Sequence, residues 1–289
     1  MNQVKTVALL GLLSALLVTI SYGVIGGVGG AVVGVGLAAL MNLGSWFYSD
    51  RIALAAYGAQ PVSPQQAPAL YRLVQRLSDR AHLPMPAVYV IPSPAANAFA
   101  TGRDPQHAAV AVTQGIMSLL SEDELEGVIA HELTHITNRD TLTQAIAATI
   151  AGAISMLAQL LSYSLWFGGS RDDDGPNPLG LLATVLLAPI AATVIQLGIS
   201  RTREFEADAG AAKLTGNPRA LARALQRLEA SASRVPMGGN PAFEPLLITN
   251  ALPKKGFSTL FSTHPSVAAR VENLLKLERD ILDRRLSAA

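Results

Sequence analysis

The sequence contains no cysteine among its 289 residues. This absence excludes disulfide bonds, thiol catalysis and thiolate metal ligands, so any metal ion must be held by His, Asp or Glu. It also suits a reducing compartment. Charge is scarce as well: charged residues make up 15% of the chain, compared with about a quarter in ordinary soluble domains. The formal net charge is +1, so no excess of positive charge indicates a nucleic-acid partner.

Hydrophobic residues make up 50% of the sequence, and they are gathered in long runs that predict an integral membrane protein. No residue from Thr6 to Ser49 is charged. A single helix of that length would span about 66 Å, roughly twice the hydrocarbon thickness, so we expect two helices. The turn is expected within residues 21–30, where glycines are frequent. Gly26, Gly30 and Gly34 recur at four-residue spacing, which lets membrane helices pack closely, or else these glycines only make the turn flexible. A cleaved signal peptide is an alternative interpretation of the first helix.

Two further apolar runs, Leu142–Phe167 and Leu179–Ile199, are each long enough to cross a bilayer. The polar turn Gly168–Pro178 joins them. A buried helical hairpin in a soluble protein is the alternative, because Pro189 and Gln196 interrupt the second run. The sequence therefore predicts about four transmembrane helices.

The distribution of basic residues predicts the orientation in the membrane. In a four-span chain, one side receives Arg171 together with three aspartates. The opposite side receives most of the basic residues near the span ends, namely Lys5, Arg51, Arg139, Arg201 and Arg203. Because basic residues favour the cytoplasmic side, we expect a multi-pass protein of the plasma (inner) membrane with both termini and the 50–140 domain in the cytoplasm.

The polar segments predict a mainly α-helical domain with a small β element. Apolar residues recur at helical spacing in Ala67–Arg80 and again in Pro265–Leu286. Ala87–Ile91 and His107–Thr113 are β-like runs, and Pro236–Gly256 resembles an irregular loop. The predicted organisation is a transmembrane hairpin (1–49), the first part of a polar domain (50–140), a second hairpin (141–199) and the second part of that domain (200–289).

A further helix is predicted after Ser121, because Ser121 and Glu124 are spaced as a capping box. This helix carries His131-Glu132-Leu133-Thr134-His135, which matches the H-E-x-x-H motif. Histidines at i and i+4 project from one helical face and can bind the same ion, whereas Glu132 lies beside the ion as a candidate general base. The alternative is a structural helix with two histidines that bind no metal.

A catalytic zinc ion needs a third protein ligand and one open position. Glu204 and Asp208 are candidates because they share a helical face, while Glu206 points elsewhere. His135 shortly precedes the third apolar run and Glu204 shortly follows the fourth. A hairpin between them would bring both ends together at one membrane face. The alternative is a charged surface helix whose acidic residues pair with neighbouring arginines.

At these motifs the chain resembles the HtpX-type membrane metalloproteases, distant relatives of the eukaryotic CAAX prenyl proteases. Residues 200–208, Asn97–Gly102 and Thr263–Pro265 carry the resemblance together with the H-E-x-x-H motif, and it covers nearly the whole chain. The resemblance implies a zincin-like catalytic domain with one Zn²⁺ per chain and Glu204 as the third zinc ligand. It also implies that Asp208 contacts a ligand histidine, and that the task is membrane-protein quality control, as in a stress response.

The expected reaction is hydrolysis of a peptide bond. Zinc would lower the pKa of water and polarise the carbonyl, while Glu132 takes a proton and delivers it to the leaving amine. Asn97, Ala98 and Phe99 are expected in an exposed strand edge that pairs with an extended substrate, unless this segment is a surface turn. His264 is expected to donate to the oxyanion or to substrate carbonyls, or else to cap the helix that follows it.

The sequence therefore predicts a membrane-anchored zinc endopeptidase that hydrolyses unfolded or misfolded membrane proteins. Its expected partners are polypeptide substrates and the lipid bilayer, without nucleic acid. Two alternatives remain, namely a non-catalytic zinc-binding membrane scaffold and a prenyl-peptide processing protease. Glu132 argues against the scaffold, because a structural zinc site has no use for a neighbouring base. Four spans, rather than a larger helical chamber, argue against prenyl-peptide processing.

Overall fold

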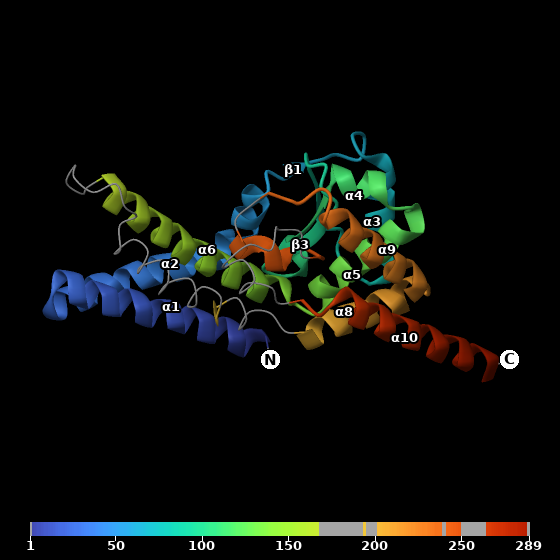
Figure 1. Ribbon diagram of the computed structural model, residues 1–289. Helices are drawn as coiled ribbons and strands as arrows, with labels where there is room; N and C mark the ends of the chain where they lie inside the picture. Colours follow the sequence, from blue (N-terminus) through green and yellow to red (C-terminus); the bar gives the residue numbers. More distant parts are fainter. Residues whose placement is uncertain (1, 168–192, 195–200, 239–240, 250–263, 288–289) are drawn as a thin grey trace.

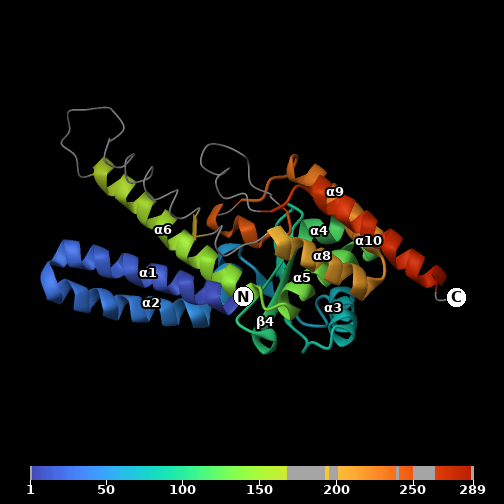
Figure 2. The same cartoon turned by 90° about the horizontal axis from the view of Figure 1, so that it is seen from below.

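A computed structural model describes residues 2–167, 193–194, 201–238, 241–249 and 264–287. The described chain is mostly helical with one small sheet, as the sequence predicts. Three long helices extend together from one side of a rounded domain (Figure 1, Figure 2). The elements are α1 (Asn2–Ile25), α2 (Gly27–Ala56), β1 (Gln60–Pro61), α3 (Pro68–Arg80), β2 (Ala87–Ile91), β3 (Ala98–Gly102), η1 (Pro105–His107), β4 (Ala108–Thr113), α4 (Gln114–Leu119), α5 (Glu122–Thr137), α6 (Thr141–Phe167), α8 (Arg201–Thr215), α9 (Pro218–Ala232), η2 (Pro241–Leu246) and α10 (Val267–Ser287).

Helices α1 and α2 form the expected hairpin, with its turn at Gly26. Gly26 has a φ of +90°, a backbone conformation that favours glycine. Closer to the domain, a Cβ on Gly34 would lie 2.6 Å from the Val18 Cα. Gly30 faces the backbone of α1 just as closely. The two helices therefore touch backbone to backbone at Gly30 and Gly34, as their four-residue spacing predicts.

Among the described residues, α2 alone is long and apolar enough to cross a membrane. Shorter apolar helical stretches are Val4–Thr19 in α1 and Thr141–Ile154 in α6. Helix α6 packs against α1 and α2, and the Thr6 and Thr143 hydroxyls are hydrogen-bonded at 2.9 Å. Nearly all of the predicted fourth span, Leu179–Ile199, lies outside the described residues, together with the turn before it.

The sheet has the strand order β1-β2-β4-β3. Strand β2 pairs with β4 in parallel, and β3 pairs with β4 antiparallel, with Ala100 opposite Val110. The two runs predicted as β-like form β2 and β4. β3 has a strand neighbour on one side only, and its other edge contacts α5, the helix that carries the H-E-x-x-H motif.

Helices pack on the sheet through the faces that the sequence predicts. In α3 the apolar positions Leu70, Leu73, Val74 and Leu77 are all buried. At the start of α5 the Ser121 backbone N–H donates to the Glu124 carboxylate at 3.0 Å, which forms that half of the capping box. The buried α5 residues share one core with α3, α9 and β4. The capping box and the apolar spacing thus predict the start and the buried face of α5, the helix that carries the two histidines.

The segment predicted as an irregular loop, Pro236–Gly256, differs from that prediction between residues 241 and 249. Residues 241–246 form a 3₁₀ helix, and Ala242, Leu247 and Ile248 are buried. The Phe243 ring packs against α6 at Gly152. The prediction is wrong here because the apolar side chains of this segment pack against α6 and β3, even though Pro and Gly nearby are typical of a loop.

The hairpin contact at Gly34 generates a stability prediction. Gly34→Ala places a Cβ against the α1 backbone and should cost about 1–3 kcal/mol, as overpacking does. Gly36→Ala is the matched control, because a Cβ at Gly36 meets no atom within 4 Å. The control should be neutral or stabilising by up to about 1 kcal/mol. Thermal unfolding of both variants in detergent checks this, and equal midpoints would contradict the close contact.

Candidate metal centre

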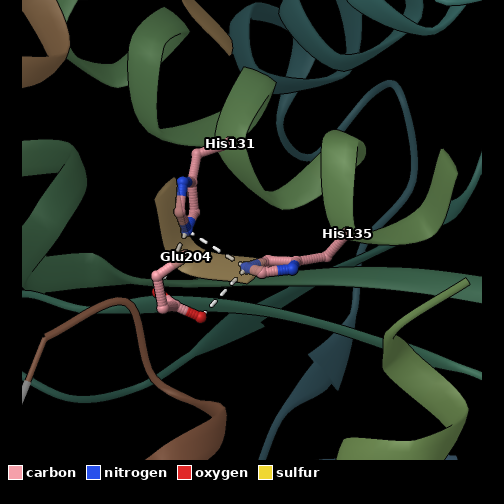
Figure 3. Close-up of side chains that lie close together, drawn as sticks. All are labelled: His131, His135 and Glu204. Carbon is pink, nitrogen blue, oxygen red and sulfur yellow. Dashed lines mark hydrogen bonds and ion pairs between the residues drawn. The ribbon is translucent and has the colours of Figure 1, made fainter. Parts of the chain in front are cut away.

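Two histidines of α5 face the same point. His131 and His135 lie one helical turn apart and are both buried. Their Nε2 atoms are 3.2 Å apart, and the two rings meet edge to face (Figure 3). The i and i+4 spacing therefore brings both Nε2 atoms to one position, as the H-E-x-x-H motif predicts.

Helix α8 brings Glu204 to this position. Its Oε1 lies 3.6 Å from His135 Nε2 and its Oε2 lies 3.8 Å from His131 Nε2 (Figure 3). The ligand atoms of the three residues all lie within 4.8 Å of one another. Gly210 allows this approach, because any side chain there would collide with Thr134 on α5. The site thus joins residues that are far apart in the sequence.

Carboxylates on the far side of each ring determine where the imidazole protons lie. His131 Nδ1 is 3.0 Å from Asp208 Oδ1, and His135 Nδ1 is 3.2 Å from Asp140 Oδ2. A neutral imidazole that donates from Nδ1 keeps a lone pair on Nε2. Both Nε2 lone pairs then point at each other across 3.2 Å. Such an arrangement is repulsive unless a proton or a metal ion lies between them.

The distances fit a zinc ion. Tetrahedral ligands at the Zn–N distance of about 2.0–2.1 Å lie about 3.3 Å apart, close to the separation of the two Nε2 atoms. Both Glu204 oxygens are buried, and within the described residues neither has a partner with hydrogen-bond geometry. His264 Nδ1 approaches Oε2 to 3.1 Å. Two imidazoles and one carboxylate are a usual donor set for catalytic zinc.

The electrostatics of the site favour a bound cation. Burial lowers the pKa of His135, but Asp140, Glu204 and Glu132 outweigh burial and raise it to about 9. Burial likewise raises the pKa of Glu204, but the neighbouring His264, His135 and Arg270 outweigh it and hold that pKa well below its ordinary value. The carboxylates thus give the position between the two rings a negative potential.

Glu132 lies outside the group of three convergent residues. Its Oε2 accepts a hydrogen bond of 2.7 Å from the Ala100 backbone N–H of β3. Burial is the main cause that raises the pKa of Glu132 above its ordinary value. The sheet edge therefore holds this carboxylate near the histidine pair.

Two further residues of the site, Arg270 and Asp140, were not predicted from the sequence. Arg270 of α10 is 1% exposed and donates to both Asp208 oxygens, at 2.7 and 2.9 Å. It also donates to the Ile248 carbonyl at 2.9 Å. In the sequence Arg270 is one of several arginines in an amphipathic helix, so no local signal distinguishes it. Asp140 follows α5 directly, and its closeness to His135 was the available signal.

The structure changes the expectation for the β3 edge. The predicted exposed edge is buried, because the Ile248 N–H donates to the Ala98 carbonyl at 3.0 Å. The Asn97 amide donates to the Thr249 carbonyl. The Phe99 ring lies in the core beside Tyr57, with their centroids 5.6 Å apart. These side chains hold the fold together at this edge, and the part of β3 nearest Glu132 is Ala100.

Comparison with known proteins agrees with this geometry. The sequence profile of peptidase family M48 matches residues 64–278. The chain belongs to this family. A protein named "Protease HtpX homolog" from Nostoc punctiforme is 70% identical over 97% of this chain and 98% of its own length. Homologues of the same name from Acaryochloris marina and Pyrococcus furiosus are 64% and 48% identical, and they cover 100% and 96% of this chain and 99% and 96% of their own lengths.

The resemblance inferred from the sequence is confirmed, and this M48 peptidase is a membrane metalloprotease. Among solved structures, the crystal structure of S. mikatae Ste24p is similar with a TM-score of 0.47 and 19% identity. The match covers 91% of this chain and 65% of that one. His131, His135 and Glu204 can accordingly be tested as the metal site of a peptidase.

Glu204 and Glu206 form a matched pair on α8 for that test. Glu204 faces the two histidines, whereas Glu206 is exposed and lines a surface hollow with Lys213. Glu204→Ala should lose most of the bound zinc, and Glu206→Ala should keep the parental zinc content. Elemental analysis of the gently purified proteins measures both. Loss of zinc from Glu206→Ala alone would show that the wrong face of α8 has been assigned.

Proposed function

We propose that this chain is a membrane-anchored zinc endopeptidase with one Zn²⁺ held by His131, His135 and Glu204. The observation that carries the proposal is the convergence of two imidazole lone pairs and a buried carboxylate directly beside Glu132. A zinc scaffold would need the three ligands but not this neighbouring carboxylate. The M48 relatives support the same conclusion, since they are named as proteases.

Glu132 is the general base in this proposal. Zinc at the site would act as a Lewis acid, which lowers the pKa of water and polarises the scissile carbonyl. Glu132 takes a proton as water adds to that carbonyl, and it then delivers the proton to the leaving amine. Burial raises the pKa of Glu132 above its ordinary value, which makes its carboxylate a stronger base than a solvated one.

The substrate is proposed to be an extended polypeptide that pairs with β3. The main support is that β3 is the last strand of the sheet and contacts Glu132 through the Ala100 N–H. Because the Ala98 carbonyl, the Ala100 N–H and the Gly102 carbonyl already have partners in the fold, the substrate must displace such a contact to pair with this edge. Extended pairing recognises the backbone rather than particular side chains, which suits unfolded substrates of varied sequence. His264, beside Glu204, is proposed to contact substrate carbonyls.

We further propose a four-span protein whose catalytic domain and termini are cytoplasmic, so that unfolded membrane proteins are its natural substrates. The end of α2 nearest the domain supports a membrane boundary there. Trp46, Phe47 and Tyr48 are exposed, and such aromatic residues gather at bilayer interfaces. The Arg51 and Arg103 guanidinium groups lie over the Tyr48 and Phe47 rings. Both arginines would then be level with the lipid headgroups, close to the catalytic domain.

Glu132→Gln separates the base from the ligands. The variant should keep parental zinc and thermal stability, because the amide oxygen can still accept from Ala100. It should lose cleavage by about a hundredfold or more, because an amide cannot take the proton. Hydrolysis of an unfolded model protein by detergent-purified chain is the measurement, with a chelator-treated parent as control. Parental turnover by Glu132→Gln would refute the mechanism.

Cysteine labelling tests the topology, because the chain has no cysteine of its own. Asp173→Cys, in the polar turn between the last two apolar runs, should react with an impermeant maleimide only from the non-cytoplasmic side. Glu122→Cys reports on the catalytic domain, since the Glu122 side chain is 83% exposed, and it should react only from the cytoplasmic side. Labelling of both positions from the same side would contradict the four-span arrangement.

A further inference from the structure

The loop between α5 and α6 places a second carboxylate behind the metal centre. Arg139 has a φ of +57°, which turns the chain sharply after α5. The Asp140 N–H then donates to the His135 carbonyl at 3.0 Å. This backbone bond fixes the 1%-exposed Asp140 carboxylate with its Oδ2 3.2 Å from His135 Nδ1. The contact is therefore built into the turn.

Arg203 of α8 provides the countercharge for this carboxylate. Its Nη1 lies 3.6 Å from Asp140 Oδ1, and both side chains are buried. A buried carboxylate needs such a partner, because an uncompensated buried charge is strongly destabilising. Arg203 directly precedes Glu204, so the same turn of α8 supplies a metal-facing carboxylate and the arginine behind His135.

The arrangement matches the one around the other histidine. On that side Asp208 contacts His131 Nδ1, and Arg270 forms a bidentate pair with Asp208. Each histidine thus has a carboxylate on Nδ1 and an arginine behind that carboxylate. The two sets share α8, which supplies Asp208 to the first and Arg203 to the second, while α10 and the α5–α6 turn supply the other members.

We propose that Asp140, held by Arg203, is the positioning residue of His135 and orients its Nε2 toward the metal ion. The inference rests on the zinc site proposed above. A carboxylate on Nδ1 fixes the imidazole tautomer, prevents rotation of the ring and makes the ligand nitrogen more basic. Loss of such a partner typically weakens metal binding by about 10–100-fold.

A purely structural role is the competing explanation. Asp140 directly precedes α6, and its carbonyl accepts the Gln144 N–H at 3.1 Å. An aspartate at this place can stabilise the start of the helix. Serine stabilises helix starts about as well as aspartate, but its hydroxyl is too short to reach His135. Asp140→Ser therefore keeps the local role and removes the proposed one.

The experiment compares zinc affinity and the cobalt spectrum in full-length Glu132→Gln protein, a background chosen because it should lack peptidase activity. Affinity is measured by competition with a chromophoric chelator, and the absorption of the Co²⁺-loaded protein reports on ligand geometry. Asp140→Ser should bind zinc about 10–100-fold more weakly and show an altered Co²⁺ spectrum. Asp140→Asn retains an oxygen acceptor for Nδ1–H, so its affinity should lie between those of Asp140→Ser and the parent. Glu206→Ser, an exposed change on α8, should equal the parent.

The outcomes distinguish a failure of the positioning role of Asp140 from a failure of the proposed zinc site. Parental zinc affinity and an unchanged Co²⁺ spectrum in Asp140→Ser would overturn the positioning role and leave only helix capping. Failure of the parent itself to bind zinc would instead refute the proposed function. If Asp140→Ser does not fold, as judged by thermal unfolding without metal, Asp140→Asn decides. A weakened affinity in that variant supports positioning, and parental affinity overturns it.

Discussion

The fold of the catalytic domain depends on one constraint, the need to hold His131 and His135 with both Nε2 atoms 3.2 Å apart inside the protein. A helix supplies the spacing, but it does not fix the ring orientation or balance the charge. Asp208 and Asp140 fix the orientation, and each brings a negative charge out of water. Burial of those charges requires cations, and Arg270 and Arg203 provide them. Breaking such a pair leaves a charge uncompensated. Each histidine therefore needs its aspartate, and each aspartate needs its arginine.

That dependence explains why distant segments meet around α5. Helix α8 can approach because Gly210 leaves room for Thr134, and it delivers Glu204, Asp208 and Arg203 together. Helix α10 closes the site from the C-terminal end through Arg270, which also bonds the Ile248 carbonyl. Ile248 in turn bonds the edge of β3, the strand that holds Glu132. The residues behind the metal site and the proposed substrate strand are thus linked through one arginine.

The sequence alone predicted what short-range patterns encode. Helical spacing identified the buried face of α3, the Ser121–Glu124 pair identified the start of α5, and β-branched runs identified β2 and β4. The i, i+4 motif indicated where the two histidines converge. Arg270 and the Ile248–Ala98 bond were not predicted, because both depend on contacts between segments far apart in the chain. An arginine in an amphipathic helix is normally solvated, and the tertiary contacts of this fold bury Arg270.

The connection between α5 and α6 gives the apolar helices a direct part in the metal site. Helix α6 begins one residue after Asp140, and Thr143 in its first turn bonds Thr6 of α1. The carboxylate behind His135 is therefore anchored on one side by the metal-binding helix and on the other by the apolar hairpin. A shift of α6 relative to α5 would move Asp140 and rotate the His135 ring. The apolar helices therefore fix one of the proposed zinc ligands as well as attaching the peptidase to a membrane.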